Sequence, residues 1–210
     1  MIDANVLVNA VRESGDHGPI NSWSRLPFIT PIRNGTMSIL PKPRVISNNV
    51  ILGTYSSQEC VDNDDGSAWY NTTGNVLIYA QYGMKSSFGG WQNHHTRNLY
   101  PMVCAAFGDG ADDIYTHNTV VAREHSGCQF WPTYASDAPT RSGPPPANFR
   151  VGGNTILSAK PVMVGAQQNL SLAAWQALGH DPGTTTGPLP TDAALQQLIR
   201  EHLGAKWPDV

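Results

Sequence analysis

A short phrase recurs along this sequence: an asparagine followed directly by a run of apolar or β-branched residues of the kind that forms strands. It begins at six places, Asn5, Asn49, Asn75, Asn98, Asn118 and Asn154. The middle intervals are 26 residues (49 to 75), 23 (75 to 98) and 20 (98 to 118), whereas the outer two are longer. A period of this length, built on short strands and Gly/Asn turns, is typical of the stacked coils of a parallel β-solenoid.

An asparagine at the start of each strand suits an internal ladder. Its amide can hydrogen-bond the equivalent amide one coil above and below, and asparagine tolerates the left-handed turn that precedes the strand. Because asparagine is also a common turn residue, an antiparallel β-sandwich remains the alternative. The abundance of glycine (20) and proline (16), with few charged residues, favours an all-β chain in either case.

The phrases divide the chain into two parts. Residues 1–160 are expected to form the β-helix coils, with a Pro/Gly-rich excursion at 132–148. Residues 161–210 are expected to form a capping segment, because 171–179 and 191–204 each have an N-cap hydroxyl, a helix-forming middle and a terminal glycine. The first coil opens at Asn5 with no cap before it, so we expect a longer chain or a further protein chain to cover that end.

Composition excludes several classes of function. The net charge is −3 and the 13 lysines and arginines do not cluster, so the chain lacks the electrostatic footprint of a nucleic-acid-binding protein. There is no apolar run of 18 residues and no signal peptide at the start, which predicts neither a membrane span nor an export signal in this chain.

Cysteines and glycosylation sequons give weaker signals. The three cysteines have no CxxC spacing, which argues against zinc, and Cys104 with Cys128 is the pair to test first for a disulfide. Three Asn-x-Ser/Thr sequons, at Asn34, Asn71 and Asn169, are candidate glycosylation sites.

Three polar segments carry a family resemblance: RESGDHGPINSWSR (12–25), SSQECVDNDDGSAWY (56–70) and YGMKSSFGGWQNHH (82–95). In this order and spacing they resemble the right-handed parallel β-helix proteins of the pectin-lyase-like superfamily, in particular an extracellular eukaryotic branch without an assigned activity. The resemblance covers roughly residues 5–130, and the later WQALGHDPGT is similar to the segment after the last coil. It implies the fold and an extracellular location. It does not imply one activity, because the superfamily includes polysaccharide lyases, glycoside hydrolases, sugar epimerases and non-catalytic proteins.

The same segments contain the candidate site. Asp16 lies 11 residues after Asn5, Glu59 lies 10 after Asn49, and Lys85 lies 10 after Asn75. Side chains at equal offsets in successive coils stack at the strand spacing of about 4.7–4.9 Å, so we expect these loops to lie side by side. The candidate catalytic residues are Asp16, His17, Glu59, Asp62 and Lys85, and the candidate substrate-binding residues are Arg12, Trp23, Trp69, Tyr70 and Trp91.

These residue types are consistent with two mechanisms of polysaccharide cleavage. Aromatic faces stack on sugar rings, and paired carboxylates can act as acid and base or nucleophile in glycoside hydrolysis. Alternatively, a lysine or histidine abstracts the proton α to a uronate carboxylate, while Ca²⁺ bound by Asp62 and Asp65 neutralises the substrate. The calcium-loop pattern fits only in part, because Val61 stands where the frame needs Asp, and a turn stabilised by side chains explains the segment equally well.

The sequence therefore predicts an extracellular β-helix protein that binds or cleaves a polysaccharide. The alternative is a non-catalytic structural glycoprotein, such as a filament subunit that stacks end to end on further copies of itself. Dense polar loops favour the first hypothesis, and the uncapped first coil favours the second.

Overall fold

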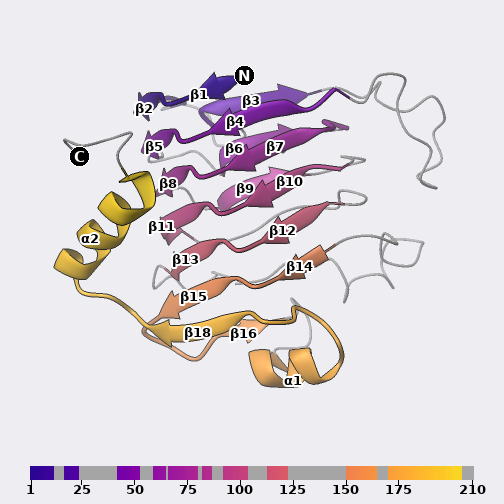
Figure 1. Ribbon diagram of the computed structural model, residues 1–210, viewed down its shortest axis with the longest axis vertical. Coiled ribbons are helices and arrows are strands. Elements are labelled where there is room, and N and C mark those ends of the chain that lie inside the picture. The colour runs from indigo at the N-terminus through magenta and orange to yellow at the C-terminus, as the bar shows by residue number, and fades with distance from the viewer. Residues whose placement is uncertain are drawn as a thin grey trace.

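The computed structural model describes residues 1–11, 17–23, 42–52, 59–64, 66–79, 82–86, 92–103, 113–122, 150–164 and 170–204; only the backbone is described for 82–86, 103, 163 and 164. All the described strands except β16 (Met163–Val164) and β17 (Leu170–Ser171) belong to three parallel sheets, whose strands succeed one another from the N-terminal to the C-terminal end (Figure 1). This confirms the predicted all-β, parallel organisation.

The three sheets take up strands in sequence order. Sheet A contains β1 (Ile2–Asp3), β4 (Arg44–Ser47), β7 (Tyr70–Thr73), β10 (His94–Thr96), β12 (Ile114–Thr116) and β14 (Arg150–Gly152). Sheet B contains β2 (Val6–Val8), β5 (Val50–Leu52), β8 (Val76–Ile78), β11 (Leu99–Val103), β13 (Thr119–Ala122), β15 (Thr155–Ser158) and β18 (Thr185–Pro188). Sheet C contains β3 (Ile20–Trp23), β6 (Glu59–Asp64) and β9 (Tyr82–Ser86). We call one passage of the chain through these sheets a rung.

An asparagine ladder joins the rungs between sheets A and B. The backbone N–H and the amide Nδ2 of Asn75 both donate to Asn98 Oδ1, at 3.1 and 2.9 Å. The same pair of bonds recurs from Asn5 to Asn49 and on to Asn154. Positive φ angles fall on the residue before each ladder asparagine, such as Arg97 at 53°, and not on the asparagine itself. The predicted ladder is therefore present.

In β5, β10 and β12 the middle residue is buried and its two neighbours are partly exposed, which is the alternation of a strand with one face on the interior. Ile46, Ile51, Val61, Leu77 and Tyr100 belong to one buried cluster that spans all three sheets. The alternate residues of the strands face outward, which is where side chains can meet a ligand.

The C-terminal end of the stack is covered. Thr184 takes the place of a ladder asparagine: its hydroxyl accepts from Asn154 N at 2.9 Å and donates to Asp181 Oδ1 at 2.6 Å. Strand β18 then pairs with β15, so sheet B continues one strand beyond the last one expected from the asparagine phrase. The helix α1 (Leu172–Ala177) and the antiparallel pair β16 (Met163–Val164) and β17 (Leu170–Ser171) lie at this end (Figure 1).

Both predicted C-terminal helices are present. Ser171 caps α1 by accepting from Ala174 N at 3.2 Å, and Thr191 caps α2 (Asp192–Leu203) by accepting from Ala194 N at 3.3 Å. Helix α2 runs along the outer face of sheet B (Figure 1). Its apolar side packs on the outward residues of that sheet, in a cluster containing Val76, Leu99, Val121, Leu195, Leu198, Ile199 and Leu203.

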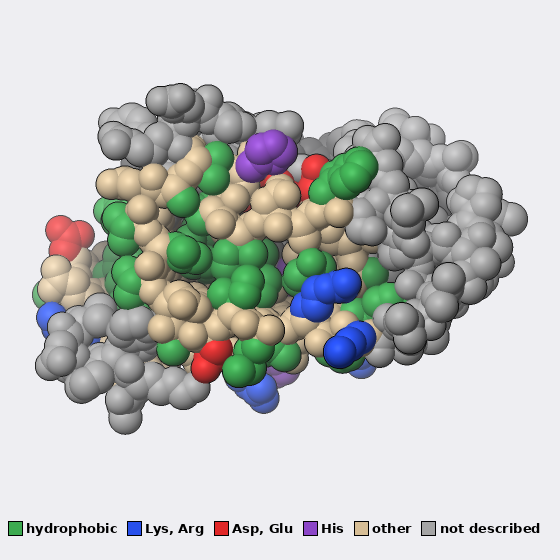
Figure 2. All heavy atoms as spheres, turned by 90° about the horizontal axis from the view of Figure 1, so that it is seen from above, with side chains coloured by type: hydrophobic (Ala, Val, Ile, Leu, Met, Phe, Trp, Pro, Cys, Tyr) green, Lys and Arg blue, Asp and Glu red, His purple; other side chains and the backbone are tan. Residues whose placement is uncertain are grey.

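The N-terminal end of the stack displays apolar side chains. Met1, Val6 and Val8 are 92%, 53% and 50% exposed. Figure 2 views the molecule from this end and shows apolar side chains gathered within a frame of backbone and polar atoms. In the described part of the chain, none of the helices has the length and apolar character needed to cross a membrane.

Candidate functional site

The candidate site lies on sheet C, where the register brings polar residues of three rungs together. Asn21 pairs with Asp62, and Asp62 pairs with Lys85. The expected alignment of Glu59 with Lys85 is not observed, because Glu59 pairs with Tyr82. The cause is loop length: Ile51 and Leu77, in sheet B, are 26 positions apart, whereas Asp62 and Lys85 are 23 apart, so the connection before β6 is three residues longer.

Asp62 is the centre of a small hydrogen-bonded cluster. Asn21 Nδ2 donates to Asp62 Oδ2 at 2.8 Å, and His17 Nδ1 lies 3.3 Å from Asn21 Nδ2 and 4.0 Å from Asp62 Oδ2. The Asp62 side chain is 0% exposed, whereas that of His17 is 50% exposed. Asp62 therefore positions its neighbours, and His17 and the exposed Asn21 present the cluster to the outside.

These contacts fix the tautomer of a neutral His17. A carboxylate only accepts, so the Asn21 atom that meets Asp62 is the amide nitrogen. The same nitrogen faces His17 Nδ1, which must therefore be the acceptor, and the ring proton lies on Nε2. His17 can then donate a hydrogen bond from Nε2 to a ligand oxygen.

Trp23 adds an aromatic surface to the cluster. It is 60% exposed and two residues after Asn21, so it lies on the same face of β3. Ser22, between them, is held on the other face: Ser22 Oγ donates to Ser67 Oγ at 2.9 Å, and Ser67 Oγ donates to Ser22 O at 2.8 Å. Strand β3 is thereby fixed with Asn21 and Trp23 side by side.

Sequence reasoning missed two residues of this cluster. Asn21 was overlooked because a single amide in a polar loop carries no motif. Gly18 brings the chain close to β6, since a Cβ at this position would lie 2.6 Å from the Glu59 carbonyl oxygen. The close approach was not visible in the sequence, because it depends on which residue stands opposite.

Other candidate residues lie elsewhere. Glu59 and Trp69 are buried, and Trp69 Nε1 donates to Gln92 Oε1 at 3.0 Å. Tyr70 belongs to sheet A, with the Arg44 guanidinium 5.3 Å from its ring centroid. Asn71 lies in the same strand, partly exposed, and its glycosylation stays a prediction.

Several predicted residues fall outside the described part of the chain. They are Arg12, Asp16, Asp65, Trp91, Asn34, Asn169, Cys104 and Cys128, together with the side chain of Lys85. Among the described residues, no three His, Cys, Asp or Glu side chains are grouped so as to hold a metal ion. The Asp62 side chain is 0% exposed, and its Oδ2 accepts from Asn21 Nδ2.

Comparisons with protein-family models, with curated proteins and with solved structures find no match to this chain.

Proposed function

We propose that this protein is an extracellular right-handed parallel β-helix that binds a polysaccharide on the outer face of sheet C. The observation that carries the proposal is the exposed Trp23 ring beside the cluster of His17, Asn21 and Asp62. An indole face stacks on a sugar ring, while neighbouring donors and acceptors bind its hydroxyl groups. The pectin-lyase-like resemblance supports the same reading.

The geometry favours one kind of cleavage chemistry, if the bound chain is cleaved. Glycoside hydrolysis needs two carboxyl groups that flank the substrate, yet Glu59 and Asp62 are both buried. A lyase-type reaction needs a base and also a donor to the leaving oxygen, and the Nε2–H of half-exposed His17, held by Asn21 beside buried Asp62, suits the donor role. We therefore place His17 at the proton-transfer step of a lyase-type reaction, with Lys85 as a second candidate on the neighbouring strand.

A binding assay tests the proposal. Immobilised polygalacturonate, alginate, xylan and chitin present uronate and neutral chains to the purified protein. We expect at least one of them to retain it, and we expect Trp23→Ala and Asp62→Asn each to weaken that binding about tenfold, as loss of a stacked ring or a buried acceptor requires. Parallel binding assays with Ca²⁺ and with EDTA test whether Asp62 and Asp65 hold a metal. Release of oligosaccharides with an unsaturated sugar at one end would identify a lyase.

Tyr79→Asn is the matched control. Tyr79 is also an exposed aromatic side chain, at 50%, but it follows β8 of sheet B. Its φ angle is 66°, and asparagine tolerates that conformation. Equal loss of binding in Tyr79→Asn and Trp23→Ala, or no retention by any polymer, would contradict the proposal.

A second candidate function is structural assembly, and the open N-terminal end supports it. The ladder asparagine of the first rung, Asn5, donates to Asn49, and the edges of β1 and β2 lie at this end beside exposed apolar side chains (Figure 2). The covered C-terminal end argues against simple head-to-tail stacking of identical chains. Assembly would then join N-terminal ends.

A further inference from the structure

The outer face of sheet A carries a column of hydroxyl groups. Cα register aligns Thr73 with Thr96 and Thr96 with Thr116, in three successive rungs. Thr96 Oγ1 donates to Thr73 Oγ1 at 3.3 Å. All three are partly exposed and alternate with buried residues of the same strands, so they face outward. Parallel strands repeat at about 4.7–4.9 Å, which makes this a regular row of small polar groups.

Basic side chains border this row on both sides. His94 and Arg150 occupy the preceding outward position of their strands, and Arg97 and His117 follow the strands in the turns. Arg97, His117 and Arg150 are exposed, and His94 is half-buried. Burial and then the nearby Arg150 guanidinium lower the pKa of His94, and β12 lies between the strands of these two residues.

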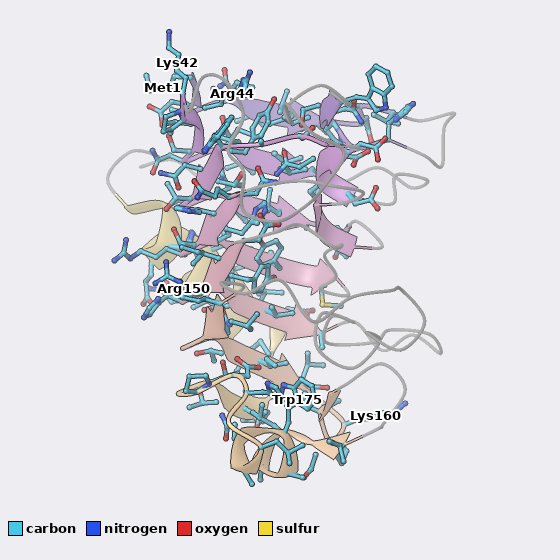
Figure 3. All side chains as sticks on the ribbon, turned by 90° about the vertical axis from the view of Figure 1, so that its right-hand side faces the viewer. Met1, Lys42, Arg44, Arg150, Lys160 and Trp175 are labelled. Carbon is cyan, nitrogen blue, oxygen red and sulfur yellow. The ribbon has the colours of Figure 1, made fainter. Side chains whose placement is uncertain are left out.

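The same edge of sheet A carries further positive charge. Lys42 and Arg44 are exposed where β4 begins, and Figure 3 shows both on the same side of the stack as Arg150. Asp3 and Asp113 offset only part of the positive charge of Lys42, Arg44, Arg97 and Arg150. Asp3 accepts from Ser47 Oγ and Asn48 Nδ2, both at 2.6 Å, and Asp113 is buried. The described part of this face is therefore basic, although the whole chain has a net charge of −3.

We infer that the outer face of sheet A binds an anionic polysaccharide, whose carboxylate or sulfate groups pair with Arg97 and Arg150 while its hydroxyls meet the threonine row. Guanidinium groups bind carboxylate and sulfate oxygens in a fork, and aligned hydroxyls suit a chain rich in hydroxyl groups. A nucleic acid fits less well. The whole chain has only 13 lysines and arginines, and the described outward residues of this sheet include no Trp, Tyr or Phe ring on which a base could stack.

This surface is separate from the cluster on sheet C, so the inference stands whether or not the proposed function is correct. The two sheets share no strand pairing among the described residues. The described contacts of the cluster on sheet C include none of Arg97, Arg150 or the threonine row.

The test measures affinity for heparin and polygalacturonate between about 50 and 200 mM NaCl, using the full chain produced without N-glycans because Asn71 lies on this face. We expect the double variant Arg97→Gln/Arg150→Gln to bind about tenfold more weakly. The slope of log affinity against log salt concentration should be smaller in magnitude by about two for this variant, since two ionic contacts are lost. Restoring charge with Arg97→Lys/Arg150→Lys should recover most of the salt slope but not all of the affinity.

The matched control is Lys160→Gln/Arg200→Gln, which removes the same charge elsewhere. Lys160 lies near the covered end, far from Arg150 along the stack (Figure 3), and Arg200 is in α2. Equal weakening in the control, equally tight binding of double-stranded DNA, binding no stronger than that of neutral dextran, or loss of heparin binding in Trp23→Ala would each overturn the inference.

Discussion

At the scale of single residues, the ladder asparagines hold one rung to the next. Asn98 shows the pattern: its Oδ1 accepts two bonds from Asn75, and its Nδ2 donates to Asn118 Oδ1 at 3.1 Å and to Thr72 O at 2.9 Å. Each of these groups is buried. A buried amide in this position therefore satisfies donors and acceptors in the rungs before and after it.

Asn98→Ala should lower the free energy of unfolding by about 3 kcal/mol or more, because it leaves several buried polar groups without partners. Urea unfolding measures the change. Asn5→Ala is the control at the exposed end of the ladder, where Nδ2 donates to Asn49 Oδ1 and Asp3 O, and its cost should be about 1 kcal/mol. Equal costs at the two positions would show that burial of the ladder does not matter.

His95 is the most perturbed histidine among the described residues. It pairs in register with Thr72 and Tyr115, it is buried, and neither ring nitrogen has a hydrogen-bond partner in the described part of the chain. Burial, and secondarily His94, lower the pKa of His95 from 6.5 to about 3. The ring is therefore neutral in the folded protein across the physiological range of pH.

Below pH 6.5 the unfolded chain takes up a proton at His95 that the folded chain does not. The free energy of unfolding should therefore fall as the pH is lowered toward 3, by up to about 1.4 kcal/mol per pH unit. Between pH 7 and pH 5, the wild type should lose about 2 kcal/mol more than His95→Leu. Urea unfolding at the two pH values gives this difference, and parallel losses in both proteins would exclude His95 as the cause.

At the scale of elements, helix α2 protects the outer face of sheet B. Leu203 is buried in the cluster formed with Val76, Leu99 and Val121. Without the helix, this apolar surface of three strands would face water. The helix therefore belongs to the cooperative structure of the stack, although it comes last in the described sequence.

Leu203→Ala should destabilise the protein by about 2 to 4 kcal/mol, as for other buried leucines. Gln197→Ala is the control in the same helix, because Gln197 donates to Glu201 Oε1 on an exposed surface and should contribute less than about 0.5 kcal/mol. Thermal unfolding compares the two variants. A loss in Leu203→Ala no larger than in Gln197→Ala would mean that α2 is not packed on the sheet.

The elements also show what sequence can and cannot specify. Strands after the ladder asparagines and the capped helices were predictable, because each depends on neighbouring residues. Strand β18 was not, since Thr184 replaces the amide with a hydroxyl. The site was predicted in part: His17 and Asp62 do meet, but the partner of Lys85 depends on loop length, and Asn21 depends on a register that no local pattern reveals.

At the scale of the whole molecule, the two ends of the stack differ. Thr184, Asp181 and α1 close the C-terminal end, whereas Val6 and Val8 lie exposed in the first strand of sheet B. A strand edge with apolar neighbours is a ready surface for pairing with another chain. The structural candidate function depends on this asymmetry.

Sedimentation tests whether the N-terminal end mediates self-association. If it does, the wild type should form dimers at micromolar concentration and Val6→Lys/Val8→Lys should be monomeric, because edge lysines block strand pairing. Leu178→Lys is the control, since Leu178 is 60% exposed beside α1 at the other end. A monomeric wild type would remove the support for assembly through this end.

A polysaccharide bound as proposed on sheet C would cover Trp23 and His17. Hydroxyl-radical footprinting with the tightest-binding polymer of the panel tests this prediction most directly, because it reports the solvent exposure of each side chain. Saturating polymer should reduce the oxidation of Trp23 several-fold and leave Tyr79 unchanged, since the two are exposed to a similar extent in the unbound protein. Undiminished oxidation of Trp23 in the saturated complex would show that the polymer does not bind over this ring.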